Sequence, residues 1–400
     1  MNIHEYQAKK ILQDYGIGTP RGCIAYTPQE AKRAAQKVSP HGPWVMKAQI
    51  QSGARAYGHF IEKKAGRGGG IRLIKSRKDI AIEAEKMLGS TLVTNQTDSK
   101  GKLVSKVYIE EFCKCGQTFY ASLIINRTIP SIALLITSST TNILELAAKE
   151  PEKILYTDLG VNDNITDEQL DKVIKFLQLP LKCHDPLQAL INNMHGAFLD
   201  LDATMIEINP VGVNKSGELI ALDAKISFDD NALFRHQDIA QMRDDYEEDD
   251  GVLKAAQYGF KYFKHDSGSI GGIVNGSGVA LSMADMLNRK GEELACFLNV
   301  KGGVDKDKIS AGIKLIMTNP RVEGILINIL GGFLRCNLVA DGIIAAASEV
   351  GLNVPLVVRF EGTNKDEARN ILTASALPVV LADTMEDAVN KLLTAMEEND

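Results

Sequence analysis

Acidic and amide side chains lie close together in a predicted β-hairpin that spans residues 204–226. Side chains of a strand alternate between the two faces of a sheet, so Glu207 and Asn209 share one face. In the register derived below, Asn209 lies opposite Asp223. An amide oxygen beside a carboxylate suits Mg²⁺, which usually keeps several waters and binds phosphate oxygens as well. The hairpin is therefore a candidate metal site. A solvated pair of polar side chains is the competing interpretation, and the residues alone favour it.

The register follows from the turn of this hairpin. Residues 215–217 can form a three-residue turn with the glycine in the left-handed region, which pairs Asn214 with Glu218. Counting back from that pair gives the alignment stated above. A bulge at Pro210 could shift it, because proline cannot donate to a strand ladder.

Two further charged residues end apolar strand segments. Lys47 lies just before a glycine-rich loop, 52–70, and a lysine in that position can neutralise phosphates. Glu110 ends a short apolar run and could accept hydrogen bonds from a ribose or a base. Ordinary solvated charges at strand ends would give the same pattern.

Two loops of the second half, 275–278 and 331–333, follow apolar strands and open helices. Ligands of open α/β sheets bind beyond the carboxyl ends of the strands, where helix N-termini present free N–H groups. A carboxylate or a phosphoryl group would be held well there. Glycines that only form tight strand-to-helix turns explain the spacing equally well.

In the first half of the chain, sequence patterns predict several helices and strands that would position these residues, but with no regular alternation. Asn2 and Glu5 have the spacing of a capping box, which predicts a helix that begins after Asn2. Thr27 followed by Pro28 predicts a second helix start, and a further helix is expected at 187–198. Strands are expected at 22–26, 44–49, 103–110, 119–126 and 131–136.

The second half has a regular period. Apolar strand segments alternate with helical segments, which is typical of a parallel, doubly wound sheet. The strands are expected at 269–274, 296–300, 324–329, 355–360 and 378–382. The helices are expected at 280–290, 307–317, 338–350, 365–374 and 385–398.

An acidic run at 244–251 separates the halves, and such a run is expected to be a solvated linker. The predicted domains are therefore 1–243, with a subdomain at about 22–105, and 252–400.

Composition excludes several classes of protein. The 400 residues are 44% hydrophobic and 24% charged with a net charge of −6, and no basic run suggests nucleic acid. No apolar stretch approaches the roughly 18–20 residues of a membrane span. The chain opens without a charged leader or an apolar segment, so a cytoplasmic protein is expected, or a mitochondrial matrix protein in a eukaryote. The six cysteines are expected to be reduced thiols. Cys113 and Cys115 lack nearby partners for a metal site.

Five motifs occur in order over essentially the whole chain: MNIHEYQAK at 1–9, EINP at 207–210, NALFR at 231–235, VNGSG at 274–278 and NILGG at 328–332. Together they resemble the family of succinyl-CoA synthetase (succinate–CoA ligase) β subunits. The resemblance implies an α/β and α+β chain, in which an ATP-grasp N-terminal region is followed by a flavodoxin-like, doubly wound parallel-sheet domain.

The resemblance also implies an activity. The family interconverts succinyl-CoA and succinate in the tricarboxylic acid cycle and couples this to ATP or GTP formation from ADP or GDP, with Mg²⁺. A separate α subunit binds CoA and carries the histidine that is phosphorylated. None of the seven histidines of this chain is a candidate for that role, so a heteromer is expected.

Site residues are carried over from the family motif by motif. The implied nucleotide-binding residues are Lys47, Ala54, Arg55, Ala56, Glu110, Cys113 and Thr118. Asn209 and Asp223 are the implied Mg²⁺ ligands, and Glu207 is the implied catalytic residue that steadies the phosphohistidine. Asn275, Gly331, Gly332 and Phe333 are the residues expected at the succinate and phosphohistidine site.

The sequence departs from the family mainly in the nucleotide half. A His-Ala-Gly-Gly-Arg-Gly-Lys loop reads QSGARAY at 51–57, and its alanines limit backbone approach to phosphate and disfavour positive φ. Thr118 replaces a nucleotide-contacting glutamate, and a Thr-Glu-Gly-Gly segment reads TSST at 137–140. In the second half an Asp-Val-Gly-Gly-Gly loop reads NVKGG at 299–303.

These changes leave two alternatives open. The chain could be a non-catalytic assembly subunit that has lost its nucleotide site, or a β subunit of a related enzyme such as malate–CoA ligase. Neither the preference for ADP or GDP nor the number of αβ pairs follows from the sequence.

Overall fold

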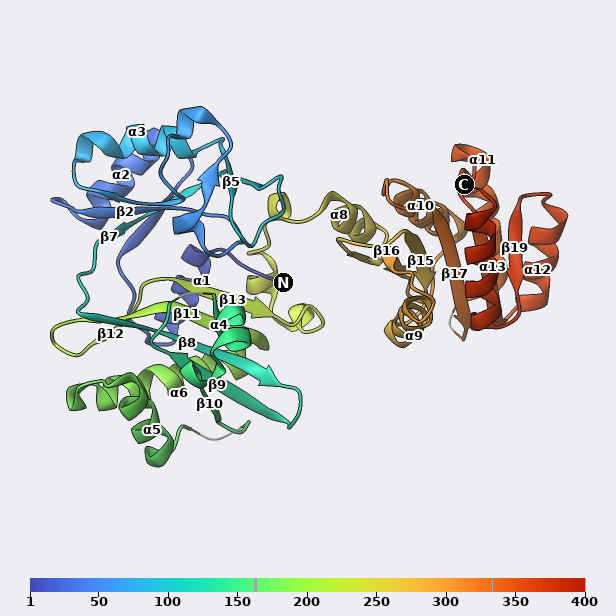
Figure 1. Ribbon diagram of the computed structural model, residues 1–400. Coiled ribbons are helices and arrows are strands. Elements are labelled where there is room, and N and C mark those ends of the chain that lie inside the picture. Colours follow the sequence, from blue (N-terminus) through green and yellow to red (C-terminus); the bar gives the residue numbers. More distant parts are fainter. Residues whose placement is uncertain (141, 162–163, 333, 400) are drawn as a thin grey trace. The chain divides into compact units, whose positions relative to one another are not determined.

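The computed structural model describes residues 1–400 except 141, 162–163, 333 and 400. The chain forms two compact units, Met1–Glu247 (unit 1) and Glu248–Asp400 (unit 2), which are described separately (Figure 1). The division falls inside the acidic segment 244–251.

A four-stranded antiparallel sheet lies in the first part of unit 1. Its strands, in spatial order, are β1 (Gly22–Ala25), β7 (Val107–Glu111), β2 (Trp44–Ala48) and β4 (Ile71–Ile74). Helices α2 (Pro28–Val38) and α3 (Arg77–Met87) cover it (Figure 1). The predicted start of α2 is confirmed, because the Thr27 side chain accepts a hydrogen bond from the N–H of Glu30. Trp44 is buried under α2 and its indole donates to the carbonyl of Ala35 at 2.8 Å.

A small three-stranded sheet joins this layer, with β5 (Thr91–Val93) between β3 (His59–Phe60) and β6 (Lys102–Leu103). Short 3₁₀ turns, η1 (Arg55–Tyr57) and η2 (Lys63–Ala65), lie in the glycine-rich loop.

A larger antiparallel sheet forms the rest of unit 1. Its spatial order is β10 (Leu155–Asp158), β9 (Ser131–Thr137), β8 (Gln117–Asn126), β11 (Ala203–Val213) and β12 (Leu219–Ala221), and β13 (Ala224–Phe228) also pairs with β11. The helices are α1 (Glu5–Asp14), α4 (Ile143–Lys149), α5 (Asp167–Leu177), α6 (His184–Asp200) and α7 (Gln237–Ala240).

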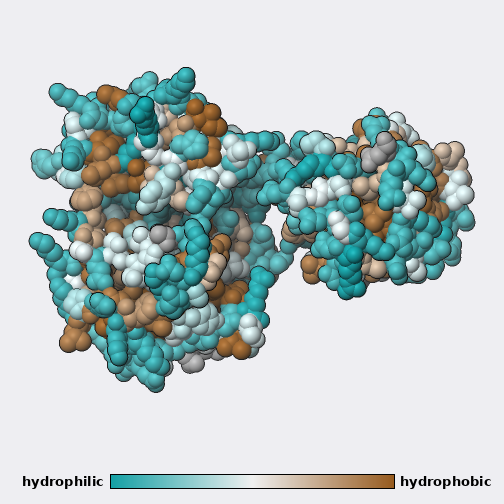
Figure 2. Space-filling model, in the orientation of Figure 1, coloured by the Kyte–Doolittle hydropathy of each residue, from teal (hydrophilic) through white to brown (hydrophobic). Residues whose placement is uncertain are grey.

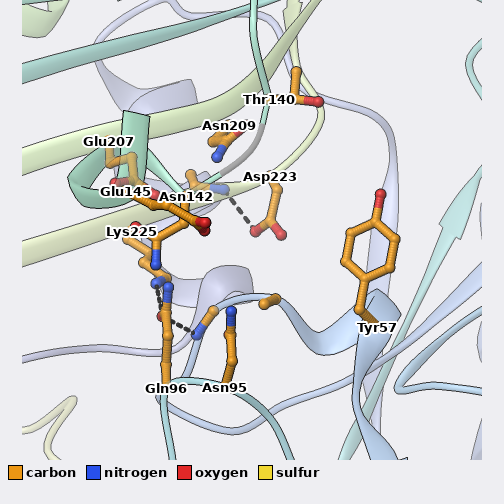
Figure 3. A pocket seen from close by; sticks show the side chains of 13 residues that line it. Tyr57, Asn95, Gln96, Thr140, Asn142, Glu145, Glu207, Asn209, Asp223 and Lys225 are labelled. Atoms are coloured by element: carbon orange, nitrogen blue, oxygen red, sulfur yellow. Dashed lines mark hydrogen bonds between the residues drawn. The ribbon is translucent and has the colours of Figure 1, made fainter. Parts of the chain in front are cut away.

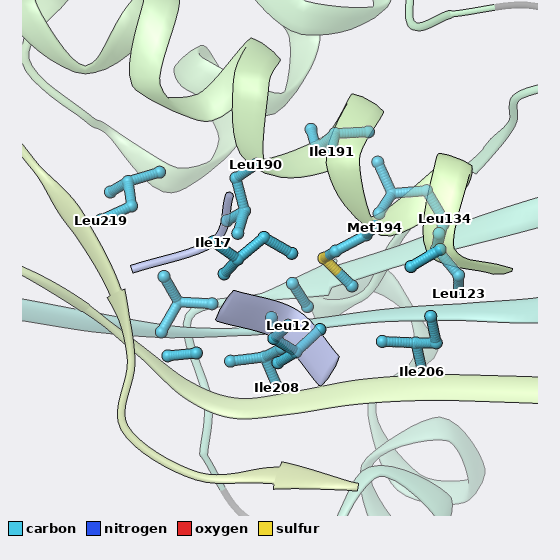
Figure 4. Packing of buried hydrophobic residues seen from close by; sticks show 14 of the residues in the cluster. Leu12, Ile17, Leu123, Leu134, Leu190, Ile191, Met194, Ile206, Ile208 and Leu219 are labelled. Carbon is cyan, nitrogen blue, oxygen red and sulfur yellow. The ribbon is translucent and has the colours of Figure 1, made fainter. Parts of the chain in front are cut away.

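The core of this part lies where α1 and α6 pack on the sheet (Figure 4). Leu12 of α1 and Met194 of α6 meet Ile206 and Ile208 of β11, and all are fully buried. Apolar burial of this kind contributes roughly 1.5–3 kcal/mol per side chain. Because α1 is fixed by this core, the polar residues on its other positions are held in place as well.

The predicted hairpin register is confirmed. Gly217 has a φ of +94°, and the N–H of Asn214 bonds to the carbonyl of Glu218 at 3.1 Å. The N–H of Asn209 bonds to the carbonyl of Asp223 at 3.2 Å, as the turn chemistry required. Next to Pro210 the register shifts only against β8, on the other side of β11. The proline therefore bends the strand without disturbing the pair at 209 and 223.

The predicted cap of the first helix is wrong. Helix α1 begins at Glu5, after His4, and the Gln7 side chain accepts the N–H of His4 at 2.9 Å. Asn2 instead forms an isolated β-bridge with Ser227, whose hydroxyl donates to the Asn2 side chain at 2.6 Å. Because Asn2 pairs with the edge of the sheet, it cannot cap the helix, which begins at Glu5 instead. A contact with a distant segment thus outweighs the capping-box pattern.

Unit 2 is a six-stranded sheet with helices on both faces, as predicted. Its order is β14 (Lys261–Lys264), β16 (Leu294–Asn299), β15 (Ile270–Val274), β17 (Gly324–Gly331), β18 (Leu356–Gly362) and β19 (Val379–Ala382). The five predicted strands are parallel, and β14, which was not predicted, is an antiparallel edge strand.

Two apolar clusters cover the faces of this sheet. Helices α9 (Ser277–Asn288) and α13 (Met385–Glu397) pack on one face. The helices α10 (Lys306–Met317), α11 (Cys336–Val350), α12 (Lys365–Ala374) and α8 (Asp250–Gln257) contribute to the other cluster.

Hydrophilic residues cover most of the face shown in Figure 2, with apolar residues interspersed among them. Among the described helices, none is long and apolar enough to cross a membrane.

The acidic segment is not solvated throughout. The Asp244 carboxylate accepts a hydrogen bond from Nε2 of buried His4 at 2.7 Å and pairs with Lys106, and the Glu247 side chain is largely buried. Lys102 donates to the Glu247 carbonyl at 2.6 Å. The expectation of a free linker is therefore wrong for Asp244 and Glu247, since two lysines and a histidine of unit 1 compensate these acids.

His4, Asp244 and Glu247 lie close enough together to hold a metal ion. The ammonium group of Lys106 bonds to Asp244 and lies 3.3 Å from Nε2 of His4, so a cation already occupies this cluster.

Burial of His4 predicts a pH dependence of stability. Desolvation lowers the pKa of His4 below its usual 6.5, Lys106 lowers it further, and Asp244 opposes both. Below about pH 6.5 the unfolded chain therefore binds more protons at this position than the folded chain, so the free energy of unfolding falls as the pH falls. We expect His4→Asn, which keeps a good helix cap, to lose a few degrees less melting temperature than the parent between about pH 7.5 and about pH 5.5.

Calorimetric melting at the two pH values measures this effect. The exposed His59 provides the matched control, since His59→Asn should leave the pH dependence of the parent unchanged. Equal losses in His4→Asn and in the parent would contradict the assignment.

Candidate functional site

A cavity of about 330 Å³, cavity A, is lined by residues of both large sheets of unit 1. Val45 and Lys47 of β2 come from the four-stranded sheet, and Asn209 and Pro210 of β11 come from the six-stranded sheet. Cavity A is lined by eight of the residues expected to bind the nucleotide or the metal: Lys47, Ala54, Arg55, Ala56, Glu110, Cys113, Asn209 and Asp223. Segments from positions 47 to 223 are thus brought to one site.

A second cavity of about 310 Å³, cavity B, adjoins cavity A (Figure 3). The two cavities share the lining residues Ala54, Tyr57, Thr140, Asn209 and Asp223. Glu207, Gln96 and Lys225 line cavity B but not cavity A. Asn209 and Asp223 therefore lie where the cavities meet, and a group bound to them is accessible from both.

The oxygen atoms of Asn209 and Asp223 fit a hard divalent cation. Among the described residues the Asn209 amide has no hydrogen-bond partner, which leaves its oxygen available. One oxygen of Asp223 accepts the N–H of Ala224 at 2.8 Å, and the other accepts from Arg55 at 2.7 Å. Two protein oxygens beside an open cavity leave room for the waters and phosphate oxygens that Mg²⁺ requires.

Six ionised side chains converge behind this pair, and we call them the charge cluster: Glu5, Lys9, Lys47, Arg55, Glu110 and Asp223. All are buried except Asp223, whose side chain is 23% exposed. Three are acids and three are bases, so the cluster is neutral overall.

Every member of the charge cluster has at least one opposite partner. Lys47 Nζ lies 2.6 Å from Glu5 and 2.7 Å from Glu110. Lys9 pairs with the same two acids, at 2.9 Å from Glu5. The Arg55 guanidinium bridges Glu5 and Asp223, at 2.7 Å from each. The carbonyl oxygen of Leu222 accepts hydrogen bonds from both lysines.

Opposite charges keep Glu5, Lys47 and Arg55 ionised despite their burial. Burial would raise the pKa of the Glu5 carboxyl, but Lys47, Lys9 and Arg55 outweigh it and hold that pKa well below its usual value. Burial would lower the pKa of Lys47, yet Glu110, Glu5 and Asp223 hold it above its usual value. Arg55 likewise has a raised pKa, because Asp223 and Glu5 outweigh its burial. Glu5, Lys47 and Arg55 are therefore charged around neutral pH.

The altered loop keeps a left-handed residue although it carries alanine. Ala54 has a φ of +55°, a conformation that costs a non-glycine residue roughly 1–2 kcal/mol. Gly70 donates its N–H to the Arg55 carbonyl at 2.8 Å, and a Cβ at Gly69 would lie 2.2 Å from the Ala56 carbonyl oxygen. Gly69 and Gly70 thus pack closely against the backbone of residues 55–56. Tyr57, the last residue of this loop, lines both cavities and its side chain is 93% exposed.

Glu207 shares a face with Asn209 as predicted and lines cavity B (Figure 3). The Tyr120 hydroxyl donates to its carboxylate at 3.0 Å. Burial raises the pKa of Glu207, and the charge of Lys225 and the Tyr120 hydrogen bond oppose this rise. Glu207 is therefore a poorly solvated acceptor next to the metal candidates.

One of the expected nucleotide-binding residues lies apart from the cavities. Thr118 is not among the residues that line either cavity, and it pairs across the sheet with Gly212. Cys113 lines cavity A, where burial raises the pKa of its thiol to about 11, so it is protonated near neutral pH.

Reasoning from the sequence missed Glu5 and Lys9. Their four-residue spacing places them on one face of helix α1, next to the apolar residues Ala8 and Leu12, and this spacing is visible in the sequence. A Glu–Lys pair at that spacing is usually a solvated surface pair, so nothing local marks it as buried.

A third cavity, cavity C of about 500 Å³, lies at the carboxyl ends of the strands of unit 2. Asn275 and Gly332, two of the residues expected at the succinate site, line it together with Ser277, Asn299 and Lys301. Phe333 lies outside the described residues. Gly331 adjoins the cavity and is required for packing, because a Cβ there would lie 2.8 Å from the nitrogen of Thr363.

The Asn275 side chain is engaged within the fold. It donates to the carbonyl of Leu330 at 2.6 Å and accepts the N–H of Leu330 at 2.7 Å, which joins the ends of β15 and β17. Asn299 accepts the N–H of Gly276 at 2.8 Å. Asn275 thus shapes the cavity, and its amide retains a second hydrogen and a second lone pair beyond these two bonds.

Two known families match the chain, one within each of the two units. The ATP-grasp domain family matches residues 2–213, and the CoA-ligase family matches residues 273–393. The expected ATP-grasp region and the following doubly wound ligase domain are thereby confirmed.

Curated relatives match over their full length. The succinate–CoA ligase [ADP-forming] subunit beta of Acidiphilium cryptum is 44% identical over 399 residues, and that of Paramagnetospirillum magneticum is 42% identical over 400. In both cases 100% of each chain is covered. Among solved structures, ATP citrate lyase from Methanothrix soehngenii aligns with a TM-score of 0.66 and 15% identity, over 98% of this chain and 99% of that one. That likeness concerns the fold.

Proposed function

Because this chain belongs to the family of succinate–CoA ligase β subunits, we propose that it is the nucleotide-binding subunit of a ligase that interconverts succinyl-CoA and succinate. In this proposal the coupled reaction forms ATP from ADP, the nucleotide that the names of its relatives carry.

The supporting observation is that Lys47, Asn209 and Asp223 line one cavity although they come from different sheets and loops. Asn209 and Asp223 would hold Mg²⁺, which when bound neutralises charge on the phosphates during phosphoryl transfer. Lys47 and Arg55 present positive charge to the same cavity. Glu207, a half-buried acceptor in cavity B, would orient an imidazole that enters from that side.

The phosphorylated histidine would come from a partner. None of the seven histidines lines cavity A, B or C. The β-subunit relatives imply an α subunit, which in this proposal supplies CoA and the histidine. Succinate would bind at cavity C, where the described lining carries one cation, Lys301, and no acid.

The proposal is tested by co-expressing the chain with the α subunit encoded in the same genome. We expect succinate-dependent formation of succinyl-CoA with ATP and Mg²⁺, and calorimetric binding of Mg·ADP. A well-assembled complex that forms no succinyl-CoA with any nucleotide would overturn it. Faster turnover of malate than of succinate would overturn the assignment of the acid alone.

The exposed tyrosine of the altered loop leads to a gain-of-affinity prediction. Family members usually carry lysine where this chain has Tyr57, at the junction of cavities A and B. A cation there would contribute about 1 kcal/mol to phosphate binding, so Tyr57→Lys should lower the Kd for Mg·ADP by roughly 3- to 10-fold. Tyr246→Lys is the matched control, because Tyr246 is equally exposed and lines neither cavity. Unchanged affinity in Tyr57→Lys would place the phosphates away from this position.

A further inference from the structure

Two members of the charge cluster stand behind the nucleotide cavity without lining it. Lys47, Arg55 and Asp223 line cavity A, but neither Glu5 nor Lys9 does. Both belong to helix α1, whose apolar residues are fixed in the core of the six-stranded sheet. Any role that they have in nucleotide binding must therefore act through their neighbours.

Glu5 connects the two cations that face the cavity. One carboxylate oxygen accepts from Lys47 Nζ at 2.6 Å, and the other accepts from Arg55 Nη2 at 2.7 Å. Lysine and arginine side chains have many rotamers and lose much of this conformational freedom when a partner holds them. The buried carboxylate of Glu5, on helix α1, thus fixes the positions of the charged groups of Lys47 and Arg55.

Lys9 balances the acids that hold Lys47. It pairs with Glu5 and Glu110, the same two carboxylates that Lys47 contacts. Without Lys9 the cluster would carry one uncompensated negative charge beside cavity A, and that charge would repel an anionic phosphate. With Lys9 present the acids are shared, and the cluster is neutral when the nucleotide arrives.

We infer that Glu5 and Lys9 are positioning residues for the Mg·nucleotide, acting through Lys47 and Arg55. This inference rests on the proposed function and extends it from the cavity wall to helix α1. It concerns the affinity for the nucleotide, a property that a purely structural ion pair would not affect in a folded protein.

The test uses a variant that keeps the cluster neutral. Glu5→Gln with Lys9→Met removes one charge of each sign, so the remaining four charges still sum to zero. We expect this double variant to fold and to bind Mg·ADP about 10- to 100-fold more weakly than the parent, the usual effect of removing a supporting residue behind a ligand site. The measurement is calorimetric titration of the full chain with Mg·ADP, with thermal melting to verify folding.

The matched control lies on the same helix. Lys10 and Asp14 form an exposed pair with the same four-residue spacing, and neither lines cavity A. Lys10→Met with Asp14→Asn should leave the Kd of the parent unchanged within about twofold. A comparable weakening in this control would attribute the effect to the helix in general and overturn the inference.

If the double variant does not fold, a second variant still tests the inference. Glu5→Asp keeps the charge but withdraws the carboxylate from Lys47 and Arg55, and we expect at least a severalfold rise in Kd for Mg·ADP. A folded double variant, or a folded Glu5→Asp protein, that binds with the parental Kd would overturn the inference while leaving the proposed function intact. A parent chain that does not bind Mg·ADP would overturn both.

Discussion

Replacing Asp223 by asparagine is expected to lower the turnover of the assembled enzyme by at least about 100-fold. Substitutions behind a metal site commonly cost 10- to 100-fold, and Asp223 is proposed to touch the metal itself. Asparagine has the same shape, and its oxygen can still accept the N–H of Ala224, which now bonds to Asp223 at 2.8 Å. The loss would therefore reflect charge and not a distorted strand.

The measurement is the rate of succinyl-CoA formation as a function of Mg²⁺ concentration. Loss of the carboxylate should raise the Mg²⁺ concentration needed for half-maximal turnover as well as lower the maximal rate. Asp202 provides a matched control, because it also pairs with an arginine, Arg235, and lines neither cavity A nor cavity B. Near-parental turnover of Asp223→Asn, or an equal loss in Asp202→Asn, would contradict the metal assignment.

Replacing Lys9 by methionine is expected to be among the most destabilising single changes in unit 1. The side chain is 1% exposed and its ammonium group lies between Glu5 and Glu110. Removal of one partner from a buried ionic network leaves an uncompensated charge and typically costs about 3–5 kcal/mol. At roughly 2–4 °C per kcal/mol for a unit of this size, the melting temperature should fall by roughly 6–20 °C.

A second substitution provides the internal check on that prediction. Adding Glu5→Gln to Lys9→Met restores neutrality, so part of the lost stability should return although another polar contact is removed. The exposed Lys10 is the single-site control, and Lys10→Met should change stability by no more than about 0.5 kcal/mol. Melting curves of Lys9→Met, Glu5→Gln, the double variant and Lys10→Met measure this directly. Additive losses at Lys9 and Glu5 would contradict the account of a balanced cluster.

The parts of the fold that local rules specify were predictable from the sequence. The turn ending in Gly217 set the register of the hairpin, and that register placed Asn209 beside Asp223. In unit 2 the alternation of apolar strands and helices was regular enough to predict all five parallel strands. The edge strand β14 was missed, since its sequence, Lys261–Lys264, carries a lysine at each end.

Other features depend on contacts between distant segments, and local rules do not contain them. The cap predicted at Asn2 was displaced because Asn2 pairs with Ser227, more than two hundred positions away. The acids at Asp244 and Glu247 were expected in solvent, yet Lys102 and Lys106, from a distant segment of unit 1, compensate them. The burial of Glu5 likewise depends on partners outside its own helix, Lys47 of β2 and Arg55 of the loop that follows.

The charge cluster has a consequence for ionic strength. Mobile salt ions weaken interactions between charges that they can surround, and at physiological concentration they do so beyond about 8 Å. The five buried members of the cluster are out of reach of such ions, whereas pairs such as Lys172 and Glu168 on the surface are not. As ionic strength rises, the charge cluster therefore stays intact while ion pairs on the surface weaken. Any loss of nucleotide affinity at high salt would then come from screening of the phosphate charges and not from a change in the charge cluster.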